Sequence, residues 1–342
     1  MNSQNTFSRK AFQFFSFVLL SVSIVACGGG GGGANGSGGG GANGGNNPPP
    51  STNSITRPTV IAFDNDNNGI TDATSTLTYD NAGRVTREEY VYMGDGVQDA
   101  FDLYHDDATQ IVNEFVYDGN GRLLRHRRTD PDDSAEYRHS YDGNGNVTRI
   151  DVTTTTAVGT VDTYIAYSYN GNQAQQFNIR LSSNDMLLVT ESYDYDLQGR
   201  VVQDLGILST GGVGYERRYS WDMLNRLDLQ EHDGNGDGIY EITYDYIFND
   251  TSGKLEQRIN INSAVPAPAE FENFTEHLTY NTSGLLETIE YDNNNDGTMD
   301  ATATVTKRES GPCAALYLPI LSKKAGQDGI PGSFVGDIVW CE

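Results

Sequence analysis

Hydrophobic and polar residues alternate with a period of two along much of the chain after residue 58. In one stretch Ile242, Tyr244, Tyr246 and Phe248 fall on one face, and polar residues fall on the other. Stretches with this period that are rich in Tyr, Val, Ile and Thr are typical of half-buried β-strands. The pattern predicts an all-β domain, because no segment beyond residue 58 has the spacing of an amphipathic helix.

A short sequence recurs between the predicted strands at intervals of about 26 residues. Its copies read YDNAGRV (79–85), YDGNGRL (117–123), YDGNGNV (141–147), YNGNQAQ (169–175), YDLQGRV (195–201), WDMLNRL (221–227), NDTSGKL (249–255) and YNTSGLL (280–286). Asp or Asn followed by Gly favours a tight turn, since Gly readily adopts positive φ. Each unit therefore predicts two strands and two turns.

The same alternation resumes after each of these turns, and we expect its apolar residues to lie on the buried face. Examples are Val201, Leu205 and Ile207 after one turn, and Leu255, Ile259 and Ile261 after another.

The motif Y-D-x-x-G-R-[LV] followed by a strand resembles the YD repeat of the RHS family, over about residues 75–290. The resemblance implies repeated antiparallel β-hairpins that form one long curled sheet, and it does not decide whether that sheet closes. Large members of the family cut themselves at an Asp-Pro within a core motif. Here Asp130-Pro131 is followed by Asp132 rather than by Gly, so only the architecture is carried over.

The repeated Tyr and Trp residues have two readings. We expect them to stabilise hairpins by packing across strands, in preference to forming a platform on which sugars stack. The Arg of the repeated Gly-Arg is expected to be an exposed cation that offsets the acidic turns.

The N-terminus has the pattern of an export signal. Arg9 and Lys10 precede an apolar segment, residues 11–26, that ends at Cys27. Ile24-Val25-Ala26-Cys27 resembles the lipobox of bacterial lipoproteins, which implies that residues 1–26 are removed and Cys27 is lipidated. Gly28 in place of Asp implies the outer membrane, with the protein periplasmic or surface-exposed. A plain secretory signal with an incidental Cys is the alternative.

Composition divides the rest of the chain into a tether, an array and a cap. Residues 27–57 are rich in Gly, Asn and Pro and are expected to form a flexible linker. Residues 58–310 carry the repeats, and residues 311–342 depart from them and are expected to cap the array. Cys313 and Cys341 lie in this cap. Export favours a disulfide between them, worth about 3 kcal/mol, and two free thiols are the alternative.

The chain is strongly acidic, with 22 Lys and Arg against 47 Asp and Glu and a net charge of −25. Without Arg9 and Lys10 the balance is 20 against 47, or about −27. A surface this negative repels phosphate backbones, so we expect no nucleic-acid partner.

Three turns carry oxygen-bearing side chains at the spacing of a calcium loop, D-x-[DN]-x-[DN]-G-x-x-[DE]. The candidate ligands are Asp64, Asp66, Asn68 and Asp72; Asp233, Asn235, Asp237 and Glu241; and Asp292, Asn294, Asp296 and Asp300. The loops resemble the short calcium loops of thrombospondin type 3 and dockerin repeats. They are not EF-hands, because the twelfth position is Ser75, Tyr244 or Ala303 rather than Glu. Weak calcium binding and pure turn chemistry are both open.

Catalytic motifs are absent from the sequence: five His residues are scattered, and no H-E-x-x-H, G-x-S-x-G or C-x-x-C occurs. We therefore expect a non-enzymatic, tethered repeat lipoprotein that acts as a binding or adhesion scaffold for a protein or glycan. A structural component of an envelope or secretion assembly, docking through sheet edges, is the alternative. An enzyme that acts on polysaccharide is a third reading.

Overall fold

The computed structural model describes residues 56–93, 110–171, 173–263 and 273–311, and these residues form eighteen β-strands. The strands are β1 (Thr56–Asp64), β2 (Ala73–Tyr79), β3 (Val85–Tyr92), β4 (Gln110–Tyr117), β5 (Leu123–Thr129), β6 (Ser134–Tyr141), β7 (Val147–Thr156), β8 (Gly159–Asn170), β9 (Gln173–Leu181), β10 (Leu187–Tyr195), β11 (Val201–Leu208), β12 (Val213–Trp221), β13 (Leu227–Asp233), β14 (Ile242–Phe248), β15 (Leu255–Asn262), β16 (Phe274–Tyr280), β17 (Leu286–Asp292) and β18 (Ala301–Ser310). The predicted all-β, antiparallel hairpin architecture is confirmed.

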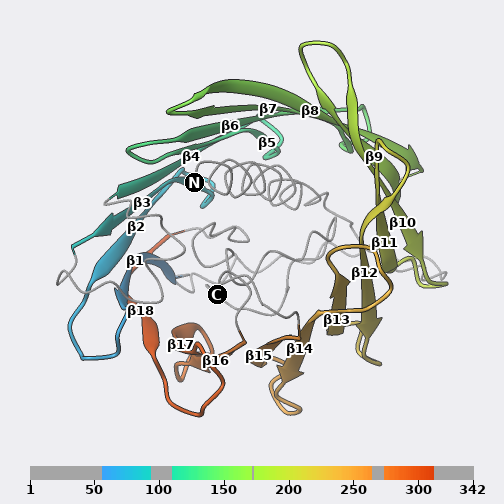
Figure 1. Cartoon of the computed structure of the whole chain (residues 1–342). Helices are drawn as coiled ribbons and strands as arrows, with labels where there is room; N and C mark the ends of the chain where they lie inside the picture. The colour runs from blue at the N-terminus through green and yellow to red at the C-terminus, as the bar shows by residue number, and fades with distance from the viewer. Residues whose placement is uncertain (1–55, 94–109, 172, 264–272, 312–342) are drawn as a thin grey trace, which may run out of the picture.

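The strands close into a barrel (Figure 1). Every strand pairs with the next one in the chain, and β18 pairs with β1 from Thr56↔Ser310 to Asp64↔Thr302. The expected curled sheet is therefore not open. Closure satisfies the backbone groups of both terminal strands, which an open sheet would leave unpaired.

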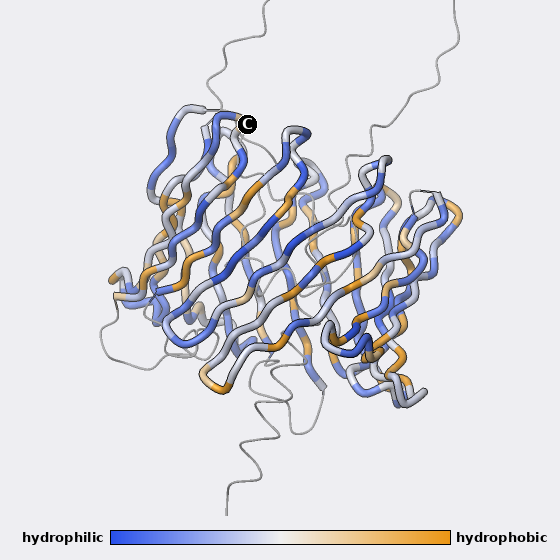
Figure 2. The backbone as a smooth tube through the Cα atoms, turned by 90° about the horizontal axis from the view of Figure 1, so that it is seen from above, coloured by the Kyte–Doolittle hydropathy of each residue, from blue (hydrophilic) through white to orange (hydrophobic). Residues whose placement is uncertain are grey.

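The buried side chains line the inside of this single layer. Along most strands burial alternates with a period of two, and the buried residues form one continuous cluster that includes Phe63, Tyr90, Ile150 and Phe177. All described strands belong to the one closed sheet, so the crowded concave face is the core face. Figure 2 shows the alternation of hydrophobic and hydrophilic residues along the obliquely running strands.

A β-bulge follows the repeated turn and changes which residues face the core. In the hairpin of β10 and β11, Tyr195 pairs with Val201 but Asp194 pairs with Gln203, so Val202 is an extra residue. Asp204 is consequently buried, whereas Leu205 lies on the outer face. The same shift buries Arg258 and leaves Ile261 exposed. The expectation that Leu205, Ile207, Ile259 and Ile261 face the core is wrong, because residue alternation does not reveal a bulge.

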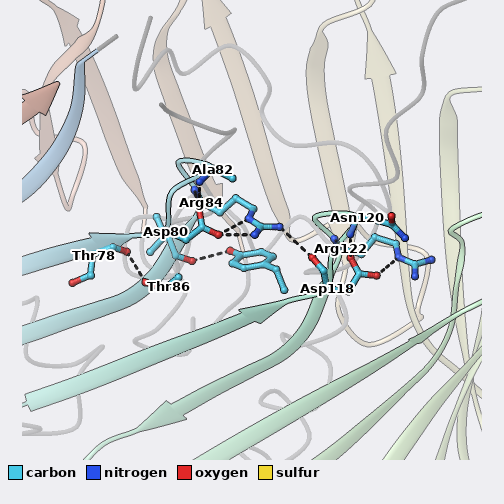
Figure 3. Close-up of polar contacts among 10 residues, drawn as sticks. Thr78, Asp80, Ala82, Arg84, Thr86, Asp118, Asn120 and Arg122 are labelled. Carbon is cyan, nitrogen blue, oxygen red and sulfur yellow. Dashed lines mark hydrogen bonds and ion pairs between the residues drawn. The ribbon is translucent and has the colours of Figure 1, made fainter. Parts of the chain in front are cut away.

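The Asp of each repeat organises its own turn. Asp80 accepts hydrogen bonds from the backbone N–H groups of Ala82 (2.9 Å) and Arg84 (3.0 Å), and its second oxygen accepts one from Arg84 Nε at 2.7 Å (Figure 3). Asp118 and Arg122 repeat this arrangement with the same Nε–oxygen distance. Gly83, at φ 83°, supplies the left-handed residue that completes the turn.

The Tyr or Trp at the end of a repeat's even strand donates a hydrogen bond to the backbone of the unit before it. The Tyr117 hydroxyl donates to the Val85 carbonyl at 2.9 Å, the Tyr141 hydroxyl to Leu123 at 2.6 Å, and Trp221 Nε1 to Val201 at 2.8 Å. These contacts give the repeated aromatics a structural role.

Where a turn carries Arg, as at Arg84, Arg122, Arg200 and Arg226, the guanidinium also lies over the aromatic ring of the next unit. Arg84 lies 4.6 Å from the ring centre of Tyr117, and Arg226 lies 4.3 Å from that of Phe248. The repeated Arg is thus partly buried between two hairpins and is not simply an exposed counter-charge.

Some of the expected features lie outside the described residues. These are residues 1–26, most of the 27–57 linker, nearly all of the 311–342 cap, the lipidation site Cys27, and the cysteines Cys313 and Cys341. Within the part of the chain that the structure describes, no helix has the length and hydropathy needed to cross a membrane.

Replacing Tyr141 with Phe tests the bond between neighbouring units. The change removes the hydroxyl and keeps the ring, and Phe248 occupies the equivalent place in the structure, at the end of β14 beneath Arg226. We expect Tyr141→Phe to lower the free energy of unfolding by about 1 kcal/mol in urea denaturation. Tyr141→Ala also removes ring packing and should cost about 2–3 kcal/mol. An unchanged midpoint for Tyr141→Phe would contradict the role given to the hydroxyl.

Candidate functional site

The three acidic loops lie on one rim of the barrel. They connect β1 to β2, β13 to β14 and β17 to β18, whereas the repeated turns connect even strands to the following odd ones. Because neighbouring strands are antiparallel, the acidic loops and the repeated turns occupy opposite rims. We call these the acidic rim and the turn rim.

The loop at residues 64–72 brings three carboxylates together. Asp64 accepts hydrogen bonds from the N–H groups of Asn68 (3.0 Å) and Gly69 (2.7 Å), and Asp72 accepts one from Asn65 at 2.7 Å. This arrangement leaves one oxygen each of Asp64, Asp66 and Asp72 within 4.8 Å of one another.

The loop at residues 233–241 repeats this geometry with a longer acid at its end. Asp233 accepts hydrogen bonds from the N–H groups of Gly236 (2.6 Å) and Gly238 (2.7 Å). Partial burial favours the neutral acid, but these backbone donors prevail and hold the pKa of Asp233 below its usual range. Asp233, Asp237 and Glu241 again have carboxylate oxygens within 4.8 Å of one another.

The loop at residues 292–300 has the same backbone scheme without the same convergence. Asp292 accepts a hydrogen bond from Gly297 N–H at 2.7 Å, and Asp300 accepts one from Asn293 at 2.8 Å. Among the described residues, acidic side chains converge to this distance in the first two loops and not in this one. The sequence match is equal in all three loops, so the difference appears only in the side-chain arrangement.

The three Asn residues among the candidate ligands act on the turn itself. The side-chain oxygens of Asn68, Asn235 and Asn294 accept hydrogen bonds of 2.8–2.9 Å from the backbone N–H two residues later. This is Asx-turn chemistry, which needs no metal. In the first two loops the converging acids are the groups available to a hard cation such as calcium.

The inner wall carries buried polar groups that the sequence did not reveal. On β10 to β12, Arg217 donates to Asp204 (2.9 Å) and to Glu191 (3.2 Å), and Tyr219 donates to Asp204 at 2.5 Å. Tyr215 also donates to Glu191. One guanidinium thus serves two carboxylates, both fully buried.

This cluster depends on a glycine opposite one of its tyrosines. Gly206 pairs with Tyr215, and a Cβ at Gly206 would come within 3 Å of the Tyr215 ring. Gly206 therefore gives the ring room to lie against the wall and reach Glu191.

A second buried cluster spans β2 to β5. Glu88 accepts hydrogen bonds from Ser75 (3.0 Å) and Asn113 (3.1 Å), and Asn113 Oδ1 lies 3.0 Å from His126 Nε2. Burial raises the pKa of Glu88 to about 7, against the lowering effect of these donors and Arg128. Burial lowers the pKa of His126 to about 3, so the imidazole is neutral.

A regular sequence position supplies these buried groups. The third residue after the Leu or Val that follows each turn faces the core, and it is Glu88, His126, Ile150, Asp204, Gln230, Arg258 or Ile289. Alignment of the repeats on this residue would have identified the position. Because this position holds polar residues in some units and apolar residues in others, the alternation of hydrophobic and polar residues does not show that it is buried.

Comparisons with known proteins do not place the chain in a family. No family model matches it, and no curated protein matches it. Among solved structures, TcdB2-TccC3-TEV is 15% identical with a TM-score of 0.25; the match covers 66% of this chain, which spans only 15% of that one. A porin-like protein from Bacteroides uniformis is 12% identical with a TM-score of 0.35, covering 73% of this chain and 96% of its own. One from Bacteroides vulgatus is 12% identical with a TM-score of 0.33, covering 73% and 98%.

The buried Glu88 should make stability depend on pH. Its pKa of about 7 in the folded state lies above the ordinary value of 4.5, so the folded protein takes up a proton between these values. The free energy of unfolding from this group therefore rises as the pH falls from about 7 to about 4.5. Glu88→Gln should remove that rise in urea denaturation series run at each pH with chelator present.

Burial lowers the pKa of His126, His139 and His232, so these groups reduce the free energy of unfolding as the pH falls. The contribution of Glu88 is therefore read from the difference in this free energy between wild type and variant at each pH. Glu256→Gln, on an exposed side chain of β15, is the control and should keep the wild-type dependence. Parallel curves for Glu88→Gln and wild type would show that Glu88 does not titrate in this range.

Proposed function

We propose that the chain is a non-enzymatic, YD-repeat barrel lipoprotein that serves as a rigid binding or adhesion scaffold in the bacterial envelope, stabilised by calcium on its acidic rim. The observation that carries the proposal is the convergence of three carboxylates in each of two loops, both held on paired strands. A lipid on Cys27 and the Gly-rich segment after it would tether the barrel to the outer membrane. Its partner would be a protein or a glycan.

Calcium suits these loops because three hard carboxylate oxygens, supplemented by water, satisfy much of its coordination. The affinity should be weak, of the order of 10⁻⁴–10⁻³ M as in extracellular modules. The position at which an EF-hand places its bidentate Glu holds Ser75, Tyr244 or Ala303, and all three are buried on the inner wall. They cannot add a ligand at the rim.

Closure of the sheet weighs against the alternative in which other proteins dock through sheet edges. Each of the eighteen described strands has two neighbours, so no free edge is available among them. Partners of a scaffold would instead meet the loops, the turns or the outer face.

Neutralising one acid in each converging loop tests the calcium sites. Asp66→Asn and Asp237→Asn in one chain keep side-chain oxygens that can accept backbone hydrogen bonds, as Asp237 does from Ile239 at 2.9 Å. We expect the wild-type protein to release or absorb heat on calcium titration and to melt several degrees higher than with chelator. The double variant should lose most of both effects.

The third loop supplies a matched control. Asp296 accepts a backbone hydrogen bond from Thr298 at 2.8 Å, as Asp237 does from Ile239, but its carboxylate belongs to no converging group. Asp296→Asn should therefore keep the calcium response. Absence of both heat and melting shift in the wild-type protein would remove calcium from the proposal.

The membrane anchor is tested separately, in cells of a Gram-negative host. Cys27→Ser removes the only residue at which the lipobox-like sequence would accept lipid. We expect the wild-type protein in the outer-membrane fraction in a lipidated form that metabolic labelling with palmitate detects. The variant should carry no label; equal labelling of both would contradict a lipid at Cys27.

A further inference from the structure

Two neighbouring turns on the turn rim carry fully exposed apolar side chains. Leu197 is 102% exposed, Met223 is 100% exposed and Leu224 is 69% exposed. Five of the other turns hold NA, GN, GN, TS and TS at the corresponding positions 81–82, 119–120, 143–144, 251–252 and 282–283. The turn itself therefore does not require apolar residues, and their presence in two turns needs another explanation.

These two turns are joined and rigid, so they form one surface. Arg200 of the first turn donates from Nη1 to Asn225 Oδ1 of the second at 2.9 Å. Asp196 and Asp222 each accept two backbone N–H groups and the Arg Nε of their own turn. The apolar side chains thus project from a fixed base, which reduces the entropy that their ordering in a contact would cost.

The chain enters and leaves the barrel on this same rim. Thr56 at the start of β1 pairs with Ser310 at the end of β18, and β1 runs from there to the acidic loop at 64–72. The polypeptide between Cys27 and Thr56 must therefore reach the barrel at the turn rim. An anchor at Cys27 would therefore hold this rim nearer to the membrane than the acidic rim, because the tether joins the barrel here.

Charge favours the same orientation. The Arg residues of the turn rim are matched by the Asp of their own turns, as in Arg84–Asp80, Arg200–Asp196 and Arg226–Asp222. The acidic rim gathers carboxylates at both converging loops. An anionic lipid surface would repel the acidic rim and leave the balanced turn rim free to approach.

We propose that the turn rim rests on a lipid surface, with Leu197, Met223 and Leu224 inserted among the head groups. The occupant is a bilayer, and no lipid molecule is bound specifically. Three apolar side chains give weak, reversible adsorption by themselves, so the contact acts with the tether and orients the acidic rim away from the membrane. This inference rests on the tether of the proposed function and deepens it.

Vesicle flotation of the mature chain without its lipid tests the surface alone. Residues 28–342 are exported behind a cleavable, non-lipoprotein signal and mixed with vesicles of phosphatidylethanolamine and a minority of phosphatidylglycerol, with chelator present. In the variant Leu197→Thr, Met223→Thr, Leu224→Ser, residues 223–224 copy the TS found in two other turns, and residue 197 takes the Thr of those turns, so the variant should fold. We expect measurable flotation of the wild type and a partition coefficient lower by about tenfold or more in the variant.

The control variant Ile70→Thr, Ile239→Thr removes two exposed apolar side chains, 62% and 63% exposed, from the acidic rim. It should float like the wild type. Absence of wild-type flotation, equal flotation of the triple variant, or loss of flotation in the acidic-rim control would each overturn the proposal. So would concentration-dependent self-association of the wild type that the triple variant abolishes, because a second copy would then cover the patch.

Failure here is distinguishable from failure of the tether. The flotation assay contains no lipidated Cys27, whereas palmitate labelling in cells reads that anchor without reference to the turn rim.

Discussion

The structure depends on one lateral contact, made by the Asp, Arg and aromatic residue of the repeat. The Asp holds the Arg of its own turn, at 2.6–2.7 Å between charged atoms in Arg84, Arg122, Arg200 and Arg226. The same guanidinium lies over the aromatic ring of the next unit, whose polar atom bonds back to the preceding backbone. A single-layer barrel has no second sheet to hold its hairpins in register at the turn rim. This chain of contacts performs that function.

The same turn determines the character of the interior. Its loop has five residues at 196–200 and six at 249–254, and in both cases it closes with a bulge. The bulge places the third residue after the Val or Leu that follows the loop on the inner face. In some units that residue is Ile150 or Ile289, and in others it is Asp204, Glu88 or Arg258. Buried charges are tolerated only when paired and hydrogen-bonded. The wall accordingly supplies partners from the neighbouring strand, such as Arg217 for Asp204 and Glu276 for Arg258.

Local chemistry could be predicted from the sequence, and the consequences of register could not. Strands, turns and the repeat period follow from residue alternation and from Asx-Gly pairs, and the structure has them. After the turns at 196–200 and 249–254, Val201 and Leu255 are buried as expected, but the residues beyond them were mispredicted because a bulge adds one residue without a distinct sequence signal. The three acidic loops match the calcium motif equally well, yet carboxylate groups come together only in the loops that begin at Asp64 and Asp233. The direction of each side chain decides this, and the motif does not give that direction. Closure was undetermined, since it depends on strands some 250 residues apart.

The region where β1 meets β18 shows why the sheet closes. Here β1 makes the contacts of a repeat with β2, although the start of β1 does not carry the repeat motif. Arg57 lies 4.1 Å from the ring centre of Tyr79, and the Tyr79 hydroxyl donates to the Pro58 carbonyl. Arg84 and the Val85 carbonyl make the same two contacts with Tyr117. Lacking a turn Asp, Arg57 pairs with Glu309 of β18 instead. At the acidic rim Asn67 Nδ2 donates a hydrogen bond to the Met299 carbonyl at 2.8 Å. In the same way, Asn295 Nδ2 donates to the Asn260 carbonyl at 3.3 Å. The last strand therefore meets the first through contacts of the kind that join neighbouring repeats, and the lateral contact extends across the closing pair of β18 and β1.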